Sequence, residues 1–337
     1  MIRIVNWLLT RKCNLKCDYC GIVRNSPNQN YPSMQHYYQN EMTTDYVTKV
    51  LDKFQRHNKD AFHIFYGGEP LLRNDLVDII SFCHQNNVKY TIITNNTDEV
   101  QPKLKQLISS VGYLKGLTSS IDPVVVCSDK SDDDRVRKSK EALYRLSKLN
   151  TSVKDLVAEV TLTKQDLPYT LDLVQVLTEQ KIYSSITSID IAKNIYYDFS
   201  NVTDEKVLLY PKDVTTLFNQ ILDSDLLVHM KEVVLPWLLS VLPSNLDCDI
   251  DRHVHNVTID VDGTLRLCLR IRGLHSPTCE AEDIFDSCYS VKEEVKEKIR
   301  VDKKLYCQGC NHTCLMMSKF IDMQPGKLEY LVHQRTC

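Results

Sequence analysis

Three cysteines near the N-terminus constrain this chain more than any other feature. Cys13, Cys17 and Cys20 have the spacing C-x3-C-x2-C and directly follow an apolar stretch, residues 2–9. Three thiolates on one short loop can hold three corners of a cubane iron–sulfur cluster, whose usual complement is four cysteines. The fourth iron then lacks a protein ligand and can bind a small molecule. On spacing alone, a zinc site and three ordinary thiols remain alternatives.

The residues around these cysteines resemble the signature of the radical SAM superfamily, T-x-x-C-N-L-x-C-x-Y-C. The positions that fill it are Thr10, Cys13, Asn14, Leu15, Cys17, Tyr19 and Cys20. The resemblance implies that the amino and carboxylate groups of S-adenosylmethionine chelate the open iron. One electron from the cluster then cleaves the sulfonium to methionine and a 5′-deoxyadenosyl radical, which abstracts hydrogen from a substrate. The resemblance also implies that Tyr19 lies against the adenine, and we expect a flavodoxin- or ferredoxin-type reductant.

Short apolar runs alternate with helical patterns over the first part of the chain. The expected strands are residues 2–9, 61–66, 88–94, 113–121, 156–163 and 185–192. Alternation of this kind predicts an α/β fold with a parallel sheet. The length of the series fits a partial (βα)6 TIM-like barrel better than a full eight-fold barrel.

The distinctive residues of this region follow the expected strands. They are the cysteine loop, Gly67-Gly68-Glu69-Pro70, Thr94-Asn95-Asn96 and Ser119-Ser120-Ile121-Asp122. Because the carboxyl ends of parallel barrel strands meet at one rim, we expect these segments to lie together and to form a functional site.

The second of these segments, residues 67–70, is similar to the superfamily's G-G-E-P motif. The resemblance implies that Gly67, Gly68 and Glu69 contact the amino group of S-adenosylmethionine. Paired glycines let the backbone approach a ligand closely, and a carboxylate suits an ammonium group. Without the resemblance, a plain turn is the simpler interpretation of Gly-Gly-Glu-Pro.

The third and fourth segments resemble the superfamily's T-N-G and S-I-D-G motifs, and each lacks the glycine. Asn96 and Pro123 stand at the glycine positions. The resemblance makes Asn95 a cofactor-binding candidate, and it makes Ser120 and Asp122 candidate partners of the ribose hydroxyls.

A second group of cysteines lies towards the C-terminus. Residues 257–261 and 264–269 are β-rich runs joined through Asp262-Gly263, a strong hairpin signal. The hairpin would bring Cys268 near Cys248. Further thiolates follow at Cys307, Cys310, Cys314 and Cys337. These thiolates predict either a structural zinc site or an auxiliary iron–sulfur cluster.

The stretch from Cys248 through Gly263 to Cys268, C-x14-G-x4-C, resembles the start of the SPASM/twitch extension of radical SAM enzymes. Its continuation is C-x2-C-x3-C, and Met316 stands where the full SPASM form has another cysteine. The resemblance therefore implies one auxiliary cluster, or a second cluster with an open iron.

These patterns divide the 337 residues into three parts. We expect a radical SAM core at 1–193, a helical insertion at 194–245 with helices at 211–222 and 231–242, and a small Cys-rich hairpin and helical domain at 246–337.

No apolar run approaches the ~18 residues of a membrane span. The net charge of −3 gives no general attraction to nucleic acid. Thirteen cysteines without a secretion signal favour metal or redox chemistry in the cytoplasm.

The resemblance predicts a radical SAM enzyme, and we expect it to modify a peptide or protein. Because Cys13 comes so early in the sequence, we expect no peptide-recognition domain before the core, which weakens the peptide hypothesis. The alternative enzymatic function is radical modification or dehydrogenation of a small molecule or nucleoside. The alternative outside catalysis is a Cys-rich zinc-binding protein.

Overall fold

A single curved sheet organises the computed structural model, which describes residues 2–15, 17, 20, 41–126, 134–149, 151–188, 211–228, 231, 256–266 and 275–280. Over these residues the sheet has nine strands in the order β6-β5-β4-β3-β2-β1-β7-β8-β9. Strands β1 to β6 run parallel to their neighbours in sequence order. The expected α/β fold with a partial barrel is confirmed.

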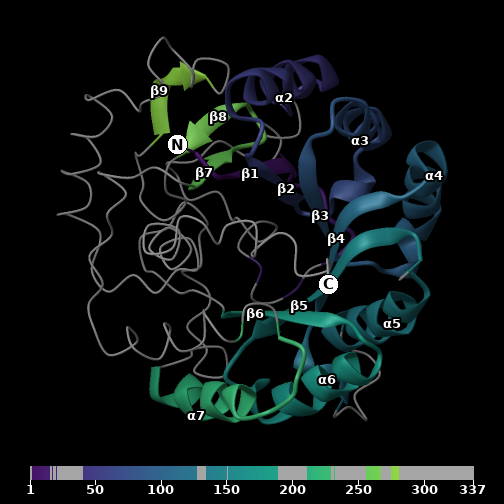
Figure 1. Ribbon diagram of the computed structural model, residues 1–337, viewed down its shortest axis with the longest axis vertical. Coiled ribbons are helices and arrows are strands. Elements are labelled where there is room, and N and C mark those ends of the chain that lie inside the picture. The colour runs from purple at the N-terminus through teal and green to yellow at the C-terminus, as the bar shows by residue number, and fades with distance from the viewer. Residues whose placement is uncertain are drawn as a thin grey trace.

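Helices connect the parallel strands and cover the outer face of the sheet (Figure 1). The strands and helices of this series are β1 (Ile4–Thr10), α2 (Thr44–Asn58), β2 (Phe62–Gly67), α3 (Leu76–Gln85), β3 (Lys89–Thr94), α4 (Gln101–Val111), β4 (Leu114–Ile121), α5 (Asp134–Leu149), β5 (Val153–Leu162), α6 (Leu167–Glu179) and β6 (Tyr183–Ser188). Short 3-10 turns lie at Pro70–Leu72, Asp98–Val100 and Pro123–Val126. The helix expected at 211–222 is α7 (Pro211–Leu222), which packs beside α6.

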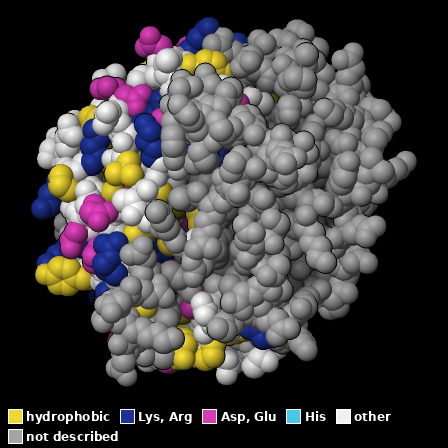
Figure 2. All heavy atoms as spheres, turned by 180° about the vertical axis from the view of Figure 1, so that it is seen from behind, with side chains coloured by type: hydrophobic (Ala, Val, Ile, Leu, Met, Phe, Trp, Pro, Cys, Tyr) yellow, Lys and Arg dark blue, Asp and Glu magenta, His cyan; other side chains and the backbone are white. Residues whose placement is uncertain are grey.

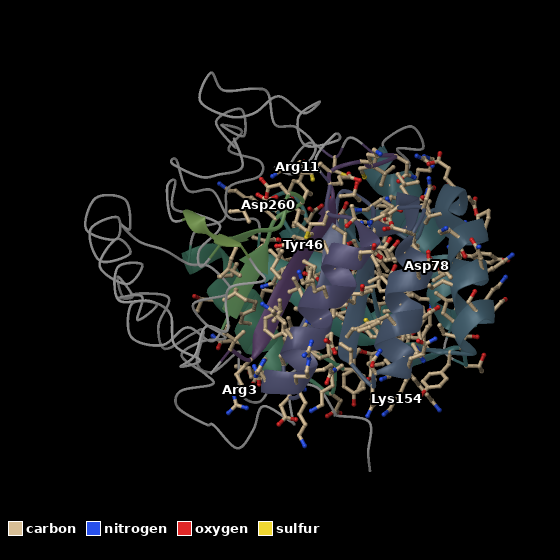
Figure 3. All side chains as sticks on the ribbon, turned by 90° about the horizontal axis from the view of Figure 1, so that it is seen from above. Arg3, Arg11, Tyr46, Asp78, Lys154 and Asp260 are labelled. Atoms are coloured by element: carbon tan, nitrogen blue, oxygen red, sulfur yellow. The ribbon has the colours of Figure 1, made fainter. Side chains whose placement is uncertain are left out.

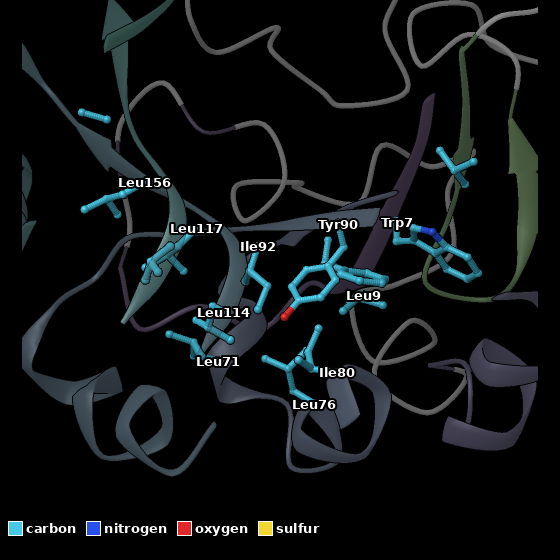
Figure 4. Close-up of a cluster of buried hydrophobic side chains, with 14 of the residues drawn as sticks. Trp7, Leu9, Leu71, Leu76, Ile80, Tyr90, Ile92, Leu114, Leu117 and Leu156 are labelled. Atoms are coloured by element: carbon cyan, nitrogen blue, oxygen red, sulfur yellow. The ribbon is translucent and has the colours of Figure 1, made fainter. Parts of the chain in front are cut away.

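The hydrophobic core lies between the sheet and these helices (Figure 4). Alternate residues of each strand face it, including Trp7, Phe65 and Ile92, which are fully buried. The Trp7 indole Nε1 donates a hydrogen bond of 3.0 Å to His63 Nδ1. Burial lowers the pKa of His63 to about 3, so the imidazole stays neutral and can accept this bond.

The opposite, concave face is mainly polar along the later strands. In register, Ser120 of β4 lies beside Glu159 of β5, and Glu159 lies beside Ser185 of β6. Two residues further along the strands, Thr161 lies beside Thr187. Parallel strands in register share a face, so these hydroxyl and carboxyl groups line one surface.

The predicted hairpin is confirmed as β7 (Asn256–Ile259) and β8 (Thr264–Arg266), which pair antiparallel. Its turn needs Gly263, whose φ is 85°, and a Cβ there would lie 2.8 Å from the Tyr46 ring. The hairpin also extends the barrel sheet, because β7 pairs in parallel with β1. Strand β9 (His275–Glu280) then pairs with β8.

The C-terminal cysteines lie outside the described residues, as does most of the helix expected at 231–242. These cysteines are Cys248, Cys268, Cys307, Cys310, Cys314 and Cys337. The domain boundaries therefore stay predictions. Among the helices described, none is both long and apolar enough to cross a membrane.

Candidate active site

The carboxyl ends of β1, β2 and β3 bring three of the predicted segments together. Gly68 N donates to Thr10 O at 2.7 Å, and Glu69 N donates to Lys12 O at 2.7 Å. Asn95 N in turn donates to the Glu69 carboxylate at 2.8 Å. The cysteine loop, the Gly-Gly-Glu segment and the Thr-Asn-Asn segment are thus joined by direct hydrogen bonds.

Thr10, the first residue of the cysteine signature, fixes the start of the loop. Its Oγ1 accepts a hydrogen bond from Lys12 N at 3.1 Å and donates to Glu41 Oε1 at 2.6 Å. These bonds fix the direction in which the loop leaves β1 and hold Lys12, the residue before Cys13.

All three motif cysteines are free thiols and partly buried. Cys20 N donates to Cys17 O at 3.1 Å, which closes a turn between these two residues. In the part of the chain that the structure describes, no three His, Cys, Asp or Glu side chains could share one metal ion. A cubane cluster does not require this convergence, because each thiolate binds a different iron. The set of three soft thiolates on one loop fits such a cluster; Tyr19 lies outside the described residues.

The environment of Cys13 disfavours a free thiolate. Burial raises the pKa of its thiol to about 12, while a hydrogen bond from Leu15 N, at 3.4 Å from Sγ, acts in the opposite direction. The nearby groups Glu69, Cys20 and Cys17 raise it further through their negative charges. Metal binding at Cys13 must therefore displace a proton.

The packing of β2 against the cysteine loop requires glycine at positions 67 and 68. A Cβ at Gly67 would lie 2.3 Å from Thr10 O, and a Cβ at Gly68 would lie 2.2 Å from Lys12 O. Both glycines therefore let β2 approach the backbone of the cysteine loop. Their contact with the amino group of a cofactor stays a prediction.

Glu69 is fully buried and ties its turn to the end of β3. Its carboxylate accepts hydrogen bonds from Leu71 N at 3.0 Å, Thr94 Oγ1 at 2.9 Å and Asn95 N at 2.8 Å. Burial raises the pKa of Glu69 to about 7, against the lowering effect of these bonds. A carboxylate has about four acceptor positions, so one remains for a further donor.

Asn95 and the two β4 candidates have different surroundings. The Asn95 side chain faces the cysteine loop, with Nδ2 3.9 Å from Cys13 Sγ. Asp122 is fully buried in a 2.9 Å ion pair with Lys138 of α5, and its backbone N donates to Ser139 Oγ at 2.8 Å. Ser120 is partly buried on the concave face. The ribose contacts of Ser120 and Asp122 stay predictions.

Two site residues have no signal in the sequence. Arg11, beside Lys12 in the cysteine loop, forms a 3.3 Å ion pair with Asp260 of the hairpin turn, and both side chains are buried (Figure 3). Lys138 is the second, since nothing around it distinguishes it from the other lysines of α5. Only the fold brings each of these cations to its carboxylate.

Comparison with known proteins agrees with this geometry. Residues 7–153 match the family model of the radical SAM superfamily. A 124-residue stretch is 29% identical to the Fe-coproporphyrin III synthase of Methanosarcina barkeri, covering 35% of this chain and 29% of that protein. A 122-residue stretch is 30% identical to the S-adenosylmethionine-dependent nucleotide dehydratase of Selenomonas ruminantium, covering 35% of this chain and 40% of that protein. The match thus spans less than half the length of either relative.

The likeness to solved structures extends over more of the chain. SuiB of Streptococcus suis superposes with a TM-score of 0.62 at 14% identity, covering 89% of this chain and 68% of SuiB. SuiB has also been solved with S-adenosylmethionine and with its precursor peptide SuiA. At this identity, the superposition supports the fold alone.

Proposed function

Since this chain belongs to the radical SAM superfamily of enzymes, we propose that it cleaves S-adenosylmethionine reductively at a 4Fe-4S cluster held by Cys13, Cys17 and Cys20. The cleavage would generate a radical that modifies a peptide. The observation that carries this proposal is the direct hydrogen bonding of the cysteine loop to the Gly-Gly-Glu and Thr-Asn-Asn segments at the rim of the sheet. A catalytically inactive zinc protein does not account for that assembly, and the superfamily's members are enzymes.

We assign the residues at this rim separate roles in binding the cluster and the cofactor. The cluster and its bound S-adenosylmethionine would supply the radical. Cys13, Cys17 and Cys20 would hold the cluster, while Gly67 and Gly68 keep the cysteine loop against the end of β2. Glu69 keeps one acceptor position for the cofactor's ammonium group, and Ser120 offers a hydroxyl from β4. Tyr19 and Asp122 complete the proposed cofactor contacts.

We place the substrate against the concave face of the sheet, next to the rim. The row from Ser120 through Glu159 to Ser185 runs across this face from the proposed ribose position. Glu159 accepts a hydrogen bond from Thr187 Oγ1 at 3.1 Å, and burial raises its pKa. A row of hydroxyl groups that includes the Glu159 carboxyl group suits a substrate rich in hydrogen-bond donors, such as a peptide backbone.

The substrate class has one alternative with specific support. The peptide hypothesis draws on the fold shared with SuiB, which has been solved with a precursor peptide. The relatives at 29–30% identity are named for a porphyrin product and a nucleotide substrate, which supports a small molecule or nucleoside instead. The polar concave face is compatible with both classes.

Three further parts of the proposal concern the rest of the chain and its surroundings. Cys248, Cys268, Cys307, Cys310 and Cys314, with Cys337 as a further candidate, would hold one or two auxiliary iron–sulfur clusters. A flavodoxin- or ferredoxin-type protein of the cytoplasm would deliver the electron. On the face shown in Figure 2, basic and acidic side chains are interspersed over the described residues, which does not favour nucleic acid as a partner.

The test is anaerobic purification followed by iron, sulfide and zinc analysis and a turnover assay. We expect bound iron and sulfide, and we expect 5′-deoxyadenosine when the protein is mixed with S-adenosylmethionine and dithionite. A colourless protein that binds zinc and forms no 5′-deoxyadenosine would overturn the proposal. Candidate substrates are then chosen from the neighbouring genes, as the peptides they encode or the nucleotides on which their products act. Each candidate is incubated with the enzyme, and its change in mass is measured.

A further inference from the structure

The Asn95 side-chain amide has only one orientation that satisfies its neighbours. Its Oδ1 lies 3.2 Å from Thr97 N and 3.0 Å from Thr97 Oγ1. A backbone N–H can only donate, so the oxygen end of the amide must face Thr97. The nitrogen end, Nδ2, therefore faces the cysteine loop.

Asn14, inside the cysteine motif, reinforces this orientation. Its Nδ2 donates to Thr97 Oγ1 at 2.9 Å and also to the Glu99 carboxylate, which can only accept. Its Oδ1 is then left to accept a hydrogen bond from Asn95 Nδ2 at 2.8 Å. Each amide in the network therefore has a defined donor end and a defined acceptor end.

The second hydrogen of Asn95 Nδ2 is available to the Cys13 sulfur, which lies 3.9 Å from the nitrogen. Leu15 N also donates to this sulfur, at 3.4 Å. The Asn95 backbone is fixed from the other side by its hydrogen bond to Glu69, and the residue is only 8% exposed. A rigid, buried N–H donor thus faces one thiolate of the proposed cluster.

N–H donors to cluster sulfurs are one of the factors that set the reduction potential of an iron–sulfur cluster. The reduced cluster carries one more negative charge than the oxidised cluster. A donor dipole aimed at a ligand sulfur therefore stabilises the reduced state more and raises the potential.

We propose that Asn95 is a positioning residue of the cluster, whose side-chain N–H, oriented by Thr97 and Asn14, donates to the Cys13 thiolate and raises the reduction potential. This inference rests on the proposed function, because it needs Cys13 to be a cluster ligand. It gives Asn95 a role other than the cofactor contact implied by the T-N-G resemblance. The electron itself comes from the external reductant in either case.

The experiment compares full-length wild type, Asn95→Ala and Asn95→Asp, each reconstituted anaerobically. The matched control is Asn86→Ala, because Asn86 is an exposed asparagine whose Nδ2 donates only to Phe82 O, at 2.9 Å, among the hydrogen bonds described. The midpoint potential is measured by dithionite titration followed by electron paramagnetic resonance. The signal that changes on addition of S-adenosylmethionine identifies the cluster with the open iron.

At the wild-type midpoint, we expect the ratio of reduced to oxidised cluster to fall severalfold in both Asn95 variants and to stay constant in Asn86→Ala. A tenfold fall corresponds to about 59 mV for a one-electron couple. The dissociation constant for S-adenosylmethionine, measured on the oxidised protein, should change less than about twofold. An unchanged midpoint together with weakened cofactor binding would overturn the inference and make Asn95 a cofactor ligand.

A second measurement needs no variant, in case either substitution prevents cluster assembly. Wild-type protein carrying asparagine labelled with nitrogen-15 in its side-chain amide should show nitrogen-15 coupling to the reduced cluster in pulsed electron paramagnetic resonance. No coupling would overturn the inference while leaving the proposed function intact. Wild-type protein without iron would overturn both.

Discussion

Arg11 and Asp260 are 249 residues apart in sequence, yet their side chains form a 3.3 Å ion pair that is almost completely shielded from solvent. Arg11 belongs to the cysteine loop, and Asp260 begins the turn of the β7–β8 hairpin. Asp260 Oδ1 also accepts a hydrogen bond from Val261 N at 2.8 Å, so the turn backbone is held by the same carboxylate. The pair therefore links the cysteine loop to the β7–β8 hairpin, which lies between Cys248 and Cys268 in the sequence.

The first prediction concerns this pair. Asp260→Asn leaves the Arg11 charge buried opposite a neutral group, and breaking a buried pair in this way costs about 3–5 kcal/mol. We expect the thermal midpoint of the protein to fall accordingly, and we expect less iron in the reconstituted cluster. Both are measured on the full chain, by thermal unfolding and by iron analysis.

The matched control for this prediction is Asp52→Asn, which removes an ion pair with Arg56 on the exposed face of α2. Exposed pairs contribute about 0–1 kcal/mol, so this variant should unfold close to the wild-type temperature. Equal effects of the two substitutions would show that the Arg11–Asp260 pair does not stabilise the fold.

The second prediction concerns the proposed cluster ligands. Cys17→Ala should abolish the formation of 5′-deoxyadenosine from S-adenosylmethionine and dithionite, because a cluster with two protein ligands is not held at the rim. Cys83→Ala is the control, since Cys83 is a fully buried thiol in the core, away from the motif. The amounts formed are compared by chromatography. Turnover in Cys17→Ala equal to that of the control would refute the ligand assignment.

The third prediction follows from the burial of Glu69. Its pKa is about 7 in the folded protein and lies near 4.5 in a solvated chain, so the folded state binds this proton more tightly. The stability that Glu69 contributes is therefore greatest below the unfolded pKa and is lost as the pH rises through about 7. The loss is at most roughly 3 kcal/mol.

Glu69→Gln cannot titrate at this position. The stability advantage of wild type over Glu69→Gln should therefore shrink between about pH 5 and about pH 8, as measured by unfolding at each pH. Glu179→Gln, an exposed substitution on α6, is the control variant and is measured at the same pH values. A constant difference between wild type and Glu69→Gln would mean that the Glu69 carboxyl group does not titrate in this range.

Sequence patterns predicted the parts of this fold that depend on local chemistry. Short apolar runs that alternate with helical patterns predicted the strands, and the Asp262-Gly263 turn predicted the hairpin. The pairing of β7 with β1 could not be predicted, because it depends on two strands far apart in the sequence whose backbones carry no specific complementarity. Tertiary packing alone decides this neighbour.

The same distinction applies to the candidate site. The strand ends predicted which segments share the rim, because parallel strands place their carboxyl ends at one edge. The physical reason for Gly67 and Gly68 was not predicted, since their close neighbours are backbone atoms of the cysteine loop. Likewise, the partner of Asp122 could not be predicted, because Lys138 reaches it only through the packing of α5 on β4.

The fourth prediction concerns the C-terminal cysteines. Cys268 comes two residues after the end of β8, and Cys248 comes eight residues before the start of β7. Because β7 and β8 pair antiparallel, their outer ends are neighbours, and we expect both cysteines to bind one metal centre. In a Cys13/Cys17/Cys20 triple alanine variant, only that centre remains. We expect about four irons per chain there, because a cubane held by four cysteines is the simplest closed site.

Adding Cys268→Ala to the triple variant should remove this iron, and because metal binding and folding are coupled, the variant should also unfold at a lower temperature. Adding Cys83→Ala instead should leave the iron content unchanged, since Cys83 is buried in the core between the sheet and α3. One zinc and no iron in the triple variant would exclude a role in electron transfer. About eight irons would show that a second cluster with an open iron is present, and iron retained after Cys268→Ala would remove Cys268 from the ligand set.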